Sequence, residues 1–313
     1  MAPVTRGDVV AAGERIAGVV RRTPVLHLDG SELGIVAPAA PVTLKLDVLQ
    51  VTGSFKARGA ASLLAAHPPT GAGVIAASGG NFGIAVAWAA ERFGHRATIV
   101  TSANAPRAKL DPIRRLGAEL VLVDGPYADA FAEAGRIVSV SGALAAHAYD
   151  DALVVAGQGT AAFELLEDAE VDTVLVAVGG GGLLAGTIAA VEGRDVRVVA
   201  VETRQTATLN AALAAGRPVD VEVGGVAASA LGARRIGRHA WAVRDGVAAS
   251  VLVDDDDVVE VVHRLWESAR IVVEPGGATA LAALVSGAYR PAEGERVSVV
   301  LCGANTDPAS VSR

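Results

Sequence analysis

The stretch TGSFKARG, residues 52–59, places one lysine between a predicted strand and a predicted helix. The preceding residues 42–48 alternate apolar and polar side chains, as a half-buried strand does. Residues 57–66 are rich in Ala and Leu and run into the sequence HPP (67–69), a pattern typical of a short helix that proline ends. Lys56 is therefore expected in the first turn of this helix.

This position predicts unusual chemistry for the Lys56 amine. Thr52, Gly53 and Ser54 are turn and N-cap residues, so they are expected to lead into the helix. A helix N-terminus carries partial positive charge, which disfavours an ammonium group there. A neutral amine attacks a carbonyl carbon and forms a Schiff base. The alternative at this point is an ordinary surface lysine at a helix start.

Length and composition limit what the chain can be. Its 313 residues suffice for one large or two medium domains, and 51% of them are hydrophobic, so a sizeable core is expected. The formal charge of −7, without a basic block, argues against nucleic acid or an anionic membrane surface as a partner. The single cysteine, Cys302, excludes an internal disulfide and favours a reducing compartment. The uncharged run 173–191 contains four consecutive glycines, so we interpret it as a strand, a turn and a helix start, and expect no membrane span.

From residue 73 onward the chain alternates predicted strands with helices. The predicted strands are 73–77, 97–101, 119–123, 173–178, 196–201 and 297–302. Strands separated by helices of about ten residues predict βαβ units, and hence an α/β fold with parallel sheets. Residues 217–249 show no clear pattern.

The tetraglycine Gly179-Gly180-Gly181-Gly182 lies between a buried strand and a helix. Exposed backbone N–H groups at a helix start favour a phosphate. The spacing of Gly180, Gly182 and Ala185 also satisfies the dinucleotide pattern G-x-G-x-x-A, and Glu202 stands where a ribose-binding acid belongs. A nicotinamide-dependent oxidoreductase is therefore a competing hypothesis from this segment.

Two further positions could contact a small molecule. The turn Ser78-Gly79-Gly80-Asn81 precedes a predicted helix and suits a carboxylate, although ordinary turn chemistry explains it equally well. Cys302 ends a predicted parallel strand, where ligands bind, but a lone cysteine is more often a buried apolar residue. The histidines show no spacing typical of metal ligands, so no metal site is expected.

Together these segments resemble the fold-type II pyridoxal-phosphate enzymes, and within them the threonine/serine dehydratases and serine racemases. The resemblance spans nearly the whole chain and rests on seven ordered motifs: RTPVL (22–26), KLDVLQVTGSFKARG (45–59), SGGN (78–81), AGQGT (156–160), VGGGGLLAG (178–186), EP (274–275) and LCGAN (301–305).

The resemblance implies two open parallel-sheet α/β domains, as in the β subunit of tryptophan synthase, with pyridoxal 5'-phosphate in the cleft between them. The large domain would comprise residues 1–72 and 148–313, and the small domain 73–147. Lys56 would carry the cofactor and act as the base. The other cofactor contacts would be Phe55, Asn81, Gly179, Gly180, Gly181, Gly182, Leu183, Gly225, Glu274 and Cys302, and the substrate carboxylate would lie on Ser78, Gly79, Gly80 and Asn81.

The chain departs from the family pattern at several positions. Glu202 matches a cation ligand of the family, but its usual acidic partner is Thr208 here, which speaks against a divalent site. Gly79 stands where racemases carry a second catalytic serine, which favours a dehydratase. Phe82 replaces a common histidine and Gly224 a common aspartate, which bears on substrate choice.

The resemblance thus implies a cytoplasmic, homodimeric ammonia-lyase that acts on a β-hydroxy amino acid, most simply L-threonine or L-serine. Within the family, serine racemase, 3-hydroxyaspartate dehydratase and a β-replacement synthase are the alternatives. Outside it stand the nicotinamide-dependent oxidoreductase and a non-catalytic cofactor-binding module. No regulatory domain is recognised after the catalytic region, so feedback inhibition by an end product is not expected.

Overall fold

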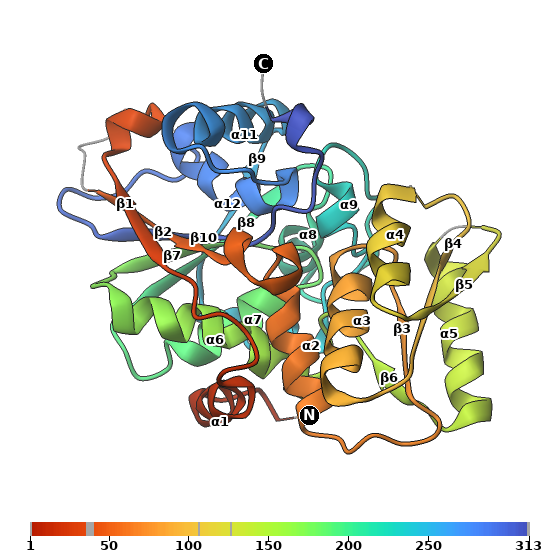
Figure 1. The fold of residues 1–313 in the computed structure, drawn as a ribbon. Helices are drawn as coiled ribbons and strands as arrows, with labels where there is room; N and C mark the ends of the chain where they lie inside the picture. Colours follow the sequence, from red (N-terminus) through yellow and green to blue (C-terminus); the bar gives the residue numbers. More distant parts are fainter. Residues whose placement is uncertain (1, 36–40, 106, 126, 312–313) are drawn as a thin grey trace.

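The computed structural model describes residues 2–35, 41–105, 107–125 and 127–311. Its strands form two sheets, one of six strands and one of four, with helices packed on both (Figure 1). The predicted α/β class with two parallel sheets is confirmed.

The larger sheet holds strands from both ends of the chain. Its order is β1 (Val25–Leu28), β2 (Val42–Leu46), β10 (Val297–Leu301), β7 (Thr173–Ala177), β8 (Arg197–Thr203) and β9 (Val247–Val253). All neighbours are parallel except the edge strand β1, which runs antiparallel to β2. Every residue of β7 and β10 is buried, because helices cover both faces of the sheet.

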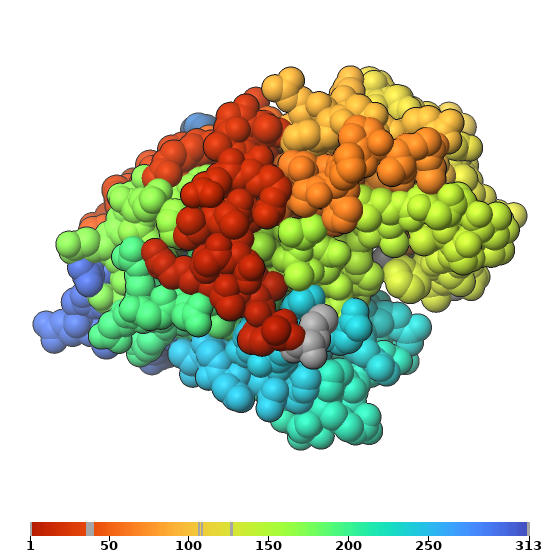
Figure 2. Space-filling view, turned by 90° about the horizontal axis from the view of Figure 1, so that it is seen from below, coloured from red at the N-terminus to blue at the C-terminus, as the bar shows by residue number. Residues whose placement is uncertain are grey.

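Two groups of helices cover this sheet. On one face lie α11 (Asp255–Ala269) and α12 (Pro275–Val285), and on the other lie α6 (Ala152–Asp168) and α7 (Gly182–Ala190) (Figure 1). The short helices α8 (Thr208–Ala215), α9 (Ala228–Leu231) and α10 (Arg238–Ala242) belong to the same part of the molecule. The N-terminal helix α1 (Arg6–Ile16), red in Figure 2, lies on the outside and packs on α6 and α2.

The smaller sheet is built from one continuous part of the chain. Its order is β5 (Glu119–Val123), β4 (Ala97–Ser102), β3 (Val74–Ala77) and β6 (Leu144–Ala146), and all neighbours are parallel. Helix α5 (Tyr127–Ser141) packs on one face of it, while α3 (Asn81–Phe93) lies on the other and contacts α4 (Arg107–Arg115).

Helix α2 (Lys56–Ala65) joins the two halves. It packs against α3 from the smaller sheet and α6 from the larger one. Its first residue is the lysine that the sequence singled out, so that lysine lies where the two sheets approach each other.

Several elements differ from the sequence expectation. The sequence pattern predicts a helix over 159–167, but α6 begins seven residues earlier, at Ala152, because Gly157 and Gly159 serve close packing and do not interrupt the helix. A Cβ on Gly157 would lie 2.6 Å from the backbone oxygen of Arg58, and a Cβ on Gly159 would lie 2.6 Å from that of Gly186. Strands β6 and β9 were not predicted; both are edge strands of their sheets, and β9 is only partly buried. Among the described residues, no helix combines the length and apolar character that crossing a bilayer requires.

Candidate active site

A pocket opens where the carboxyl ends of β7 and β10 face the start of α3. It brings together most residues singled out from the sequence: Phe55, Lys56, Asn81, Gly179, Gly180, Gly181, Gly182, Leu183, Glu274 and Cys302. They lie on segments that follow strands or begin helices beside both sheets, and these segments are far apart in the sequence. Ligands of open α/β sheets bind at this edge, so the location fits a binding site.

Some expected members lie elsewhere. Ser78, Gly79 and Gly80 are not among the pocket-lining residues, although they directly precede Asn81, which is. Gly225 is exposed and does not line the pocket; a Cβ on it would lie 2.2 Å from Oδ2 of Asp255.

Lys56 is the first residue of α2. The N-cap is Phe55, and no side chain caps the helix, so the expectation of a cap from Thr52, Gly53 or Ser54 was wrong. The Lys56 Nζ donates a hydrogen bond to the carbonyl of Ala148 at 3.0 Å and lies 4.7 Å from the centre of the Phe55 ring.

Burial lowers the pKa of Lys56 to about 8, and the nearby acidic groups of Cys302 and Glu274 only partly oppose this shift. The expected lowering is therefore present, with desolvation as its main cause instead of the helix end. A substantial fraction of the amine is neutral near pH 7 to 8, which a nucleophile requires.

The four glycines leave no room for side chains. A Cβ on Gly180 would lie 2.3 Å from the Tyr149 ring, and one on Gly181, whose φ is +85°, would lie 2.4 Å from Cβ of Ala240. Helix α7 begins at Gly182 without a side-chain cap. Its first N–H groups therefore remain available to an anion, as a phosphate site requires.

A chain of three polar side chains borders the pocket. Asn81 Nδ2 donates to Oε1 of Glu274 at 2.5 Å, and Asn305 Nδ2 donates to Oδ1 of Asn81 at 2.8 Å. Burial raises the pKa of Glu274 to about 7, while the bond from Asn81 opposes that rise. Glu274 can therefore hold or release a proton near neutral pH.

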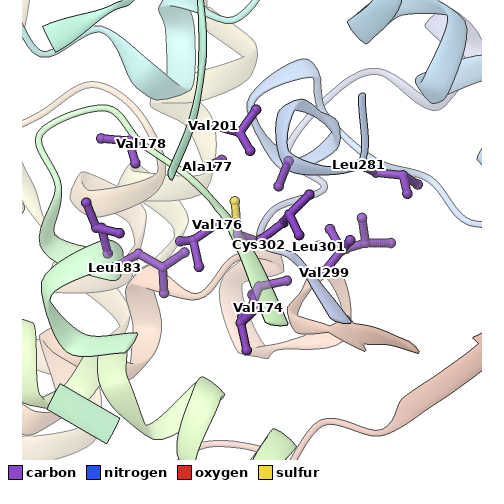
Figure 3. Close-up of a cluster of buried hydrophobic side chains, with 14 of the residues drawn as sticks. Val174, Val176, Ala177, Val178, Leu183, Val201, Leu281, Val299, Leu301 and Cys302 are labelled. Atoms are coloured by element: carbon purple, nitrogen blue, oxygen red, sulfur yellow. The ribbon is translucent and has the colours of Figure 1, made fainter. Parts of the chain in front are cut away.

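Cys302 follows β10 and lies among buried side chains of the larger sheet, including Val176 and Leu301 (Figure 3). Its Sγ is 3.7 Å from the carbonyl oxygen of Gly276. Burial raises the pKa of the thiol to about 12, so it stays neutral in the working range of most enzymes. The thiol can therefore contact a ligand in the pocket as an uncharged group.

Glu202 is completely buried at the end of β8 and faces α8. Its carboxylate accepts hydrogen bonds from the backbone N–H groups of Leu209 and Asn210, each at 2.8 Å, and contacts the Thr208 hydroxyl at 3.1 Å. These contacts occupy the carboxylate with the start of α8, so it is not open to a ribose, which weakens the nicotinamide hypothesis. Across the described ranges, no group of three or more metal-ligating side chains comes together.

Tyr149 is a pocket residue that sequence reasoning missed. It lies between β6 and α6, and its ring packs against the position of Gly180. Because β6 was not predicted, the sequence offered no sign that this segment ends a strand beside the site. Ala177, Ala230, Leu231 and Gly276 also line the pocket and were not predicted.

The residues present fit pyridoxal phosphate. A buried amine with a lowered pKa suits its aldehyde, the glycine loop and the uncapped start of α7 suit its phosphate, and the neutral Cys302 thiol suits a pyridine nitrogen.

Comparison with known proteins agrees with this fit. Residues 16–303 match the model of the family described as "Pyridoxal-phosphate dependent enzyme". The chain is 34% identical to an L-threonine ammonia-lyase of Thermotoga maritima, covering 99% of this chain and 78% of the relative, and 36% identical to a phenylserine dehydratase of Ralstonia pickettii, covering 96% and 92%. A solved maize serine racemase superposes with a TM-score of 0.91 at 29% identity, covering 99% of this chain and 96% of that one. The chain therefore belongs to the family of pyridoxal-phosphate dependent enzymes.

Proposed function

We propose that the protein is an ammonia-lyase that converts a β-hydroxy amino acid into a 2-oxo acid and ammonia. L-threonine and L-serine are the proposed substrates. The observation that carries the proposal is the buried Lys56 amine, with its pKa near 8, beside an uncapped glycine loop in one pocket. The similarity to relatives named threonine ammonia-lyase and phenylserine dehydratase supports the same reaction class.

Pyridoxal phosphate, when bound, supplies the electron sink that makes the α-hydrogen of an amino acid acidic. Lys56 would hold the cofactor and, once displaced by substrate, accept the α-proton at Nζ. The Gly179–Leu183 backbone would bind the phosphate, with Phe55 and Asn81 beside the ring. The neutral Cys302 thiol would leave the ring nitrogen largely unprotonated, which favours β-elimination over more extensive carbanion chemistry.

The substrate carboxylate would bind at the start of α3. Gly80 is the N-cap of this 13-residue helix, and no side chain caps it. Its first N–H groups and the Ser78-Gly79-Gly80-Asn81 turn are thus suited to an anion. Loss of the α-proton and the β-hydroxyl amounts to loss of water, and hydrolysis of the resulting enamine releases ammonia and the 2-oxo acid.

Gly79 favours the lyase over a racemase. A Cβ at this position would lie 2.2 Å from Oγ1 of Thr101, so the site has no ready space for a second acid there. The similarity to serine racemase structures keeps that activity as the second candidate. Formation of D-serine from L-serine, followed by chiral chromatography, measures it directly.

Steady-state release of 2-oxo acid from serine, threonine, 3-hydroxyaspartate and phenylserine tests the main proposal. Release from at least one of them is expected, and release from none would reject it. The domain division at residues 73 and 147, the homodimer and the cytoplasmic location are further parts of the proposal. Light scattering after gel filtration measures the oligomer, and cell fractionation measures the location.

A further inference from the structure

Asn305 is not among the residues that line the pocket, yet its side chain touches two segments on which the pocket depends. Its Nδ2 donates to the carbonyl oxygen of Thr52 at 2.9 Å and to Oδ1 of Asn81 at 2.8 Å. Thr52 lies in the loop that leads to Lys56, and Asn81 begins α3 beside the smaller sheet. Asn305 therefore connects the lysine loop to the other half of the site.

These contacts determine which way each amide points. A carbonyl oxygen only accepts hydrogen bonds, so the Asn305 atom that faces Thr52 must be nitrogen. Both hydrogens of that nitrogen are then used, and the Asn81 atom that it meets must be oxygen. The Asn81 nitrogen is left to face Glu274, where it donates at 2.5 Å. The Thr52 carbonyl thus orients the Asn305 amide, and the Asn305 amide orients the Asn81 amide. This fixes the direction in which the Asn81 N–H groups point at the pocket.

The backbone at Thr52 has an uncommon conformation that allows these hydrogen bonds. Thr52 has a φ of +64°, and only Arg270 shares a positive φ among the described residues other than glycine. A β-branched residue rarely adopts this conformation. A Cβ on the next residue, Gly53, would lie 2.4 Å from Oδ1 of Asn305, so the glycine allows the close approach. The strained turn and the glycine both place the Thr52 carbonyl within reach of Asn305.

We propose that Asn305 is a positioning residue that fixes the orientation of the Asn81 amide and couples the lysine loop to α3. It acts on the cofactor through Asn81 and through the loop that leads to Lys56, and not by lining the pocket itself. The inference rests on the proposed site in one respect, namely that Asn81 contacts the cofactor ring.

Two substitutions of Asn305 separate orientation from simple packing. In N305A the Asn81 amide loses its partner and can rotate, so we expect affinity for pyridoxal phosphate to fall roughly tenfold, as loss of one buried hydrogen bond implies. In N305D the new carboxylate can only accept, so it repels the Thr52 carbonyl and draws the Asn81 nitrogen toward itself. We expect N305D to bind the cofactor more weakly than N305A and to shift the absorption maximum of the bound cofactor.

The measurements are cofactor titration of the resolved apo-protein and the absorption spectrum of the holoenzyme. The matched control is N104D, because Asn104 is exposed in a loop after β4 and the change adds the same charge; wild-type values are expected. Wild-type affinity and spectrum in both Asn305 variants, even with a lowered melting temperature, would overturn the proposal. So would an N305D variant no more impaired than N305A.

The cofactor titration and the absorption spectrum do not depend on whether the enzyme releases 2-oxo acid. If the wild type binds the cofactor but releases no 2-oxo acid, the lyase is rejected while the Asn305 variants still test positioning. If N305D does not fold, as judged by circular dichroism, N305A alone decides the proposal. An N305A variant with the cofactor affinity and absorption spectrum of the wild type would then reject it.

Discussion

Helix α2 carries two basic side chains, Lys56 and Arg58, whose surroundings are opposite. Both lie in its first turn, two residues apart. Arg58 is completely buried, and its guanidinium donates to Asp47, Glu164, Thr160 and Thr23. Within the part of the chain that the structure describes, the Lys56 Nζ donates one hydrogen bond, to the Ala148 carbonyl, and otherwise lies near the Phe55 and Phe82 rings.

The two environments have opposite effects on the charge. Burial by itself would lower the pKa of Arg58, but pairing with Asp47 and Glu164 raises it above its ordinary value. The same burial lowers the pKa of Lys56 to about 8, because no carboxylate forms an ion pair with it among the described residues. A buried cation with partners stays charged and serves the fold, whereas a buried amine without them becomes a nucleophile.

Removing the unpaired amine should have the largest effect on activity. For K56A we expect steady-state 2-oxo acid release to fall by on the order of 10⁴-fold, because both the cofactor attachment and the proton acceptor are lost. K56R should be equally impaired, since a guanidinium stays protonated. Urea denaturation of the apo-proteins should show K56A at least as stable as the wild type and K56R less stable, because its buried guanidinium has no ion-pair partner among the described residues. Activity within tenfold of wild type in either variant would contradict the role of Lys56.

Removing the paired cation, Arg58, should instead lower the stability of the fold. In R58M the carboxylates of Asp47 and Glu164 lose a buried partner, so we expect the free energy of unfolding to fall by about 3–5 kcal/mol. The matched control is R136M, which removes the exposed Arg136–Glu133 pair and should cost less than about 1 kcal/mol. Urea unfolding of the apo-proteins measures both. Equal losses in the two variants would show that the Arg58 cluster does not stabilise the fold.

The lowered pKa of Lys56 predicts a pH dependence. Only the neutral amine attacks an aldehyde, so the rate of covalent capture of pyridoxal phosphate by the apo-protein should rise with pH and level off above about 8. With a pKa of about 8 the neutral fraction grows about 50-fold from pH 6 to pH 8. Stopped-flow absorbance measures the rate. A rate that keeps rising tenfold per unit to pH 10 would indicate an ordinary lysine.

The smallest effect is expected at Cys302, whose raised pKa keeps it neutral. Serine at this position is also neutral, so C302S should retain kcat within about threefold. C302D puts a carboxylate in the same place and should lose much more, because an acid changes the protonation of the ring nitrogen. Comparable kcat values for the serine and aspartate variants would show that charge at this position is unimportant.

The sequence was most informative where local chemistry and position coincide. The TGSFKARG stretch and the glycine run predicted the lysine and the glycine loop, because strand, turn and helix signals surround each of them. Tyr149 and Asn305 were not assigned roles, since their positions depend on contacts with segments more than 30 residues away. The cause of the Lys56 pKa shift was also misjudged, because burial by distant segments cannot be read from a helix start.

The most direct test of the account is to identify the lysine that binds the cofactor. The chain has only three lysines, Lys45, Lys56 and Lys109, and Lys45 is buried in an ion pair with Glu164. The purified protein should be yellow, lose that absorbance on borohydride reduction, and yield one modified peptide containing Lys56 by mass spectrometry. A colourless protein that pyridoxal phosphate cannot reconstitute, or an adduct on Lys45 or Lys109, would contradict the account.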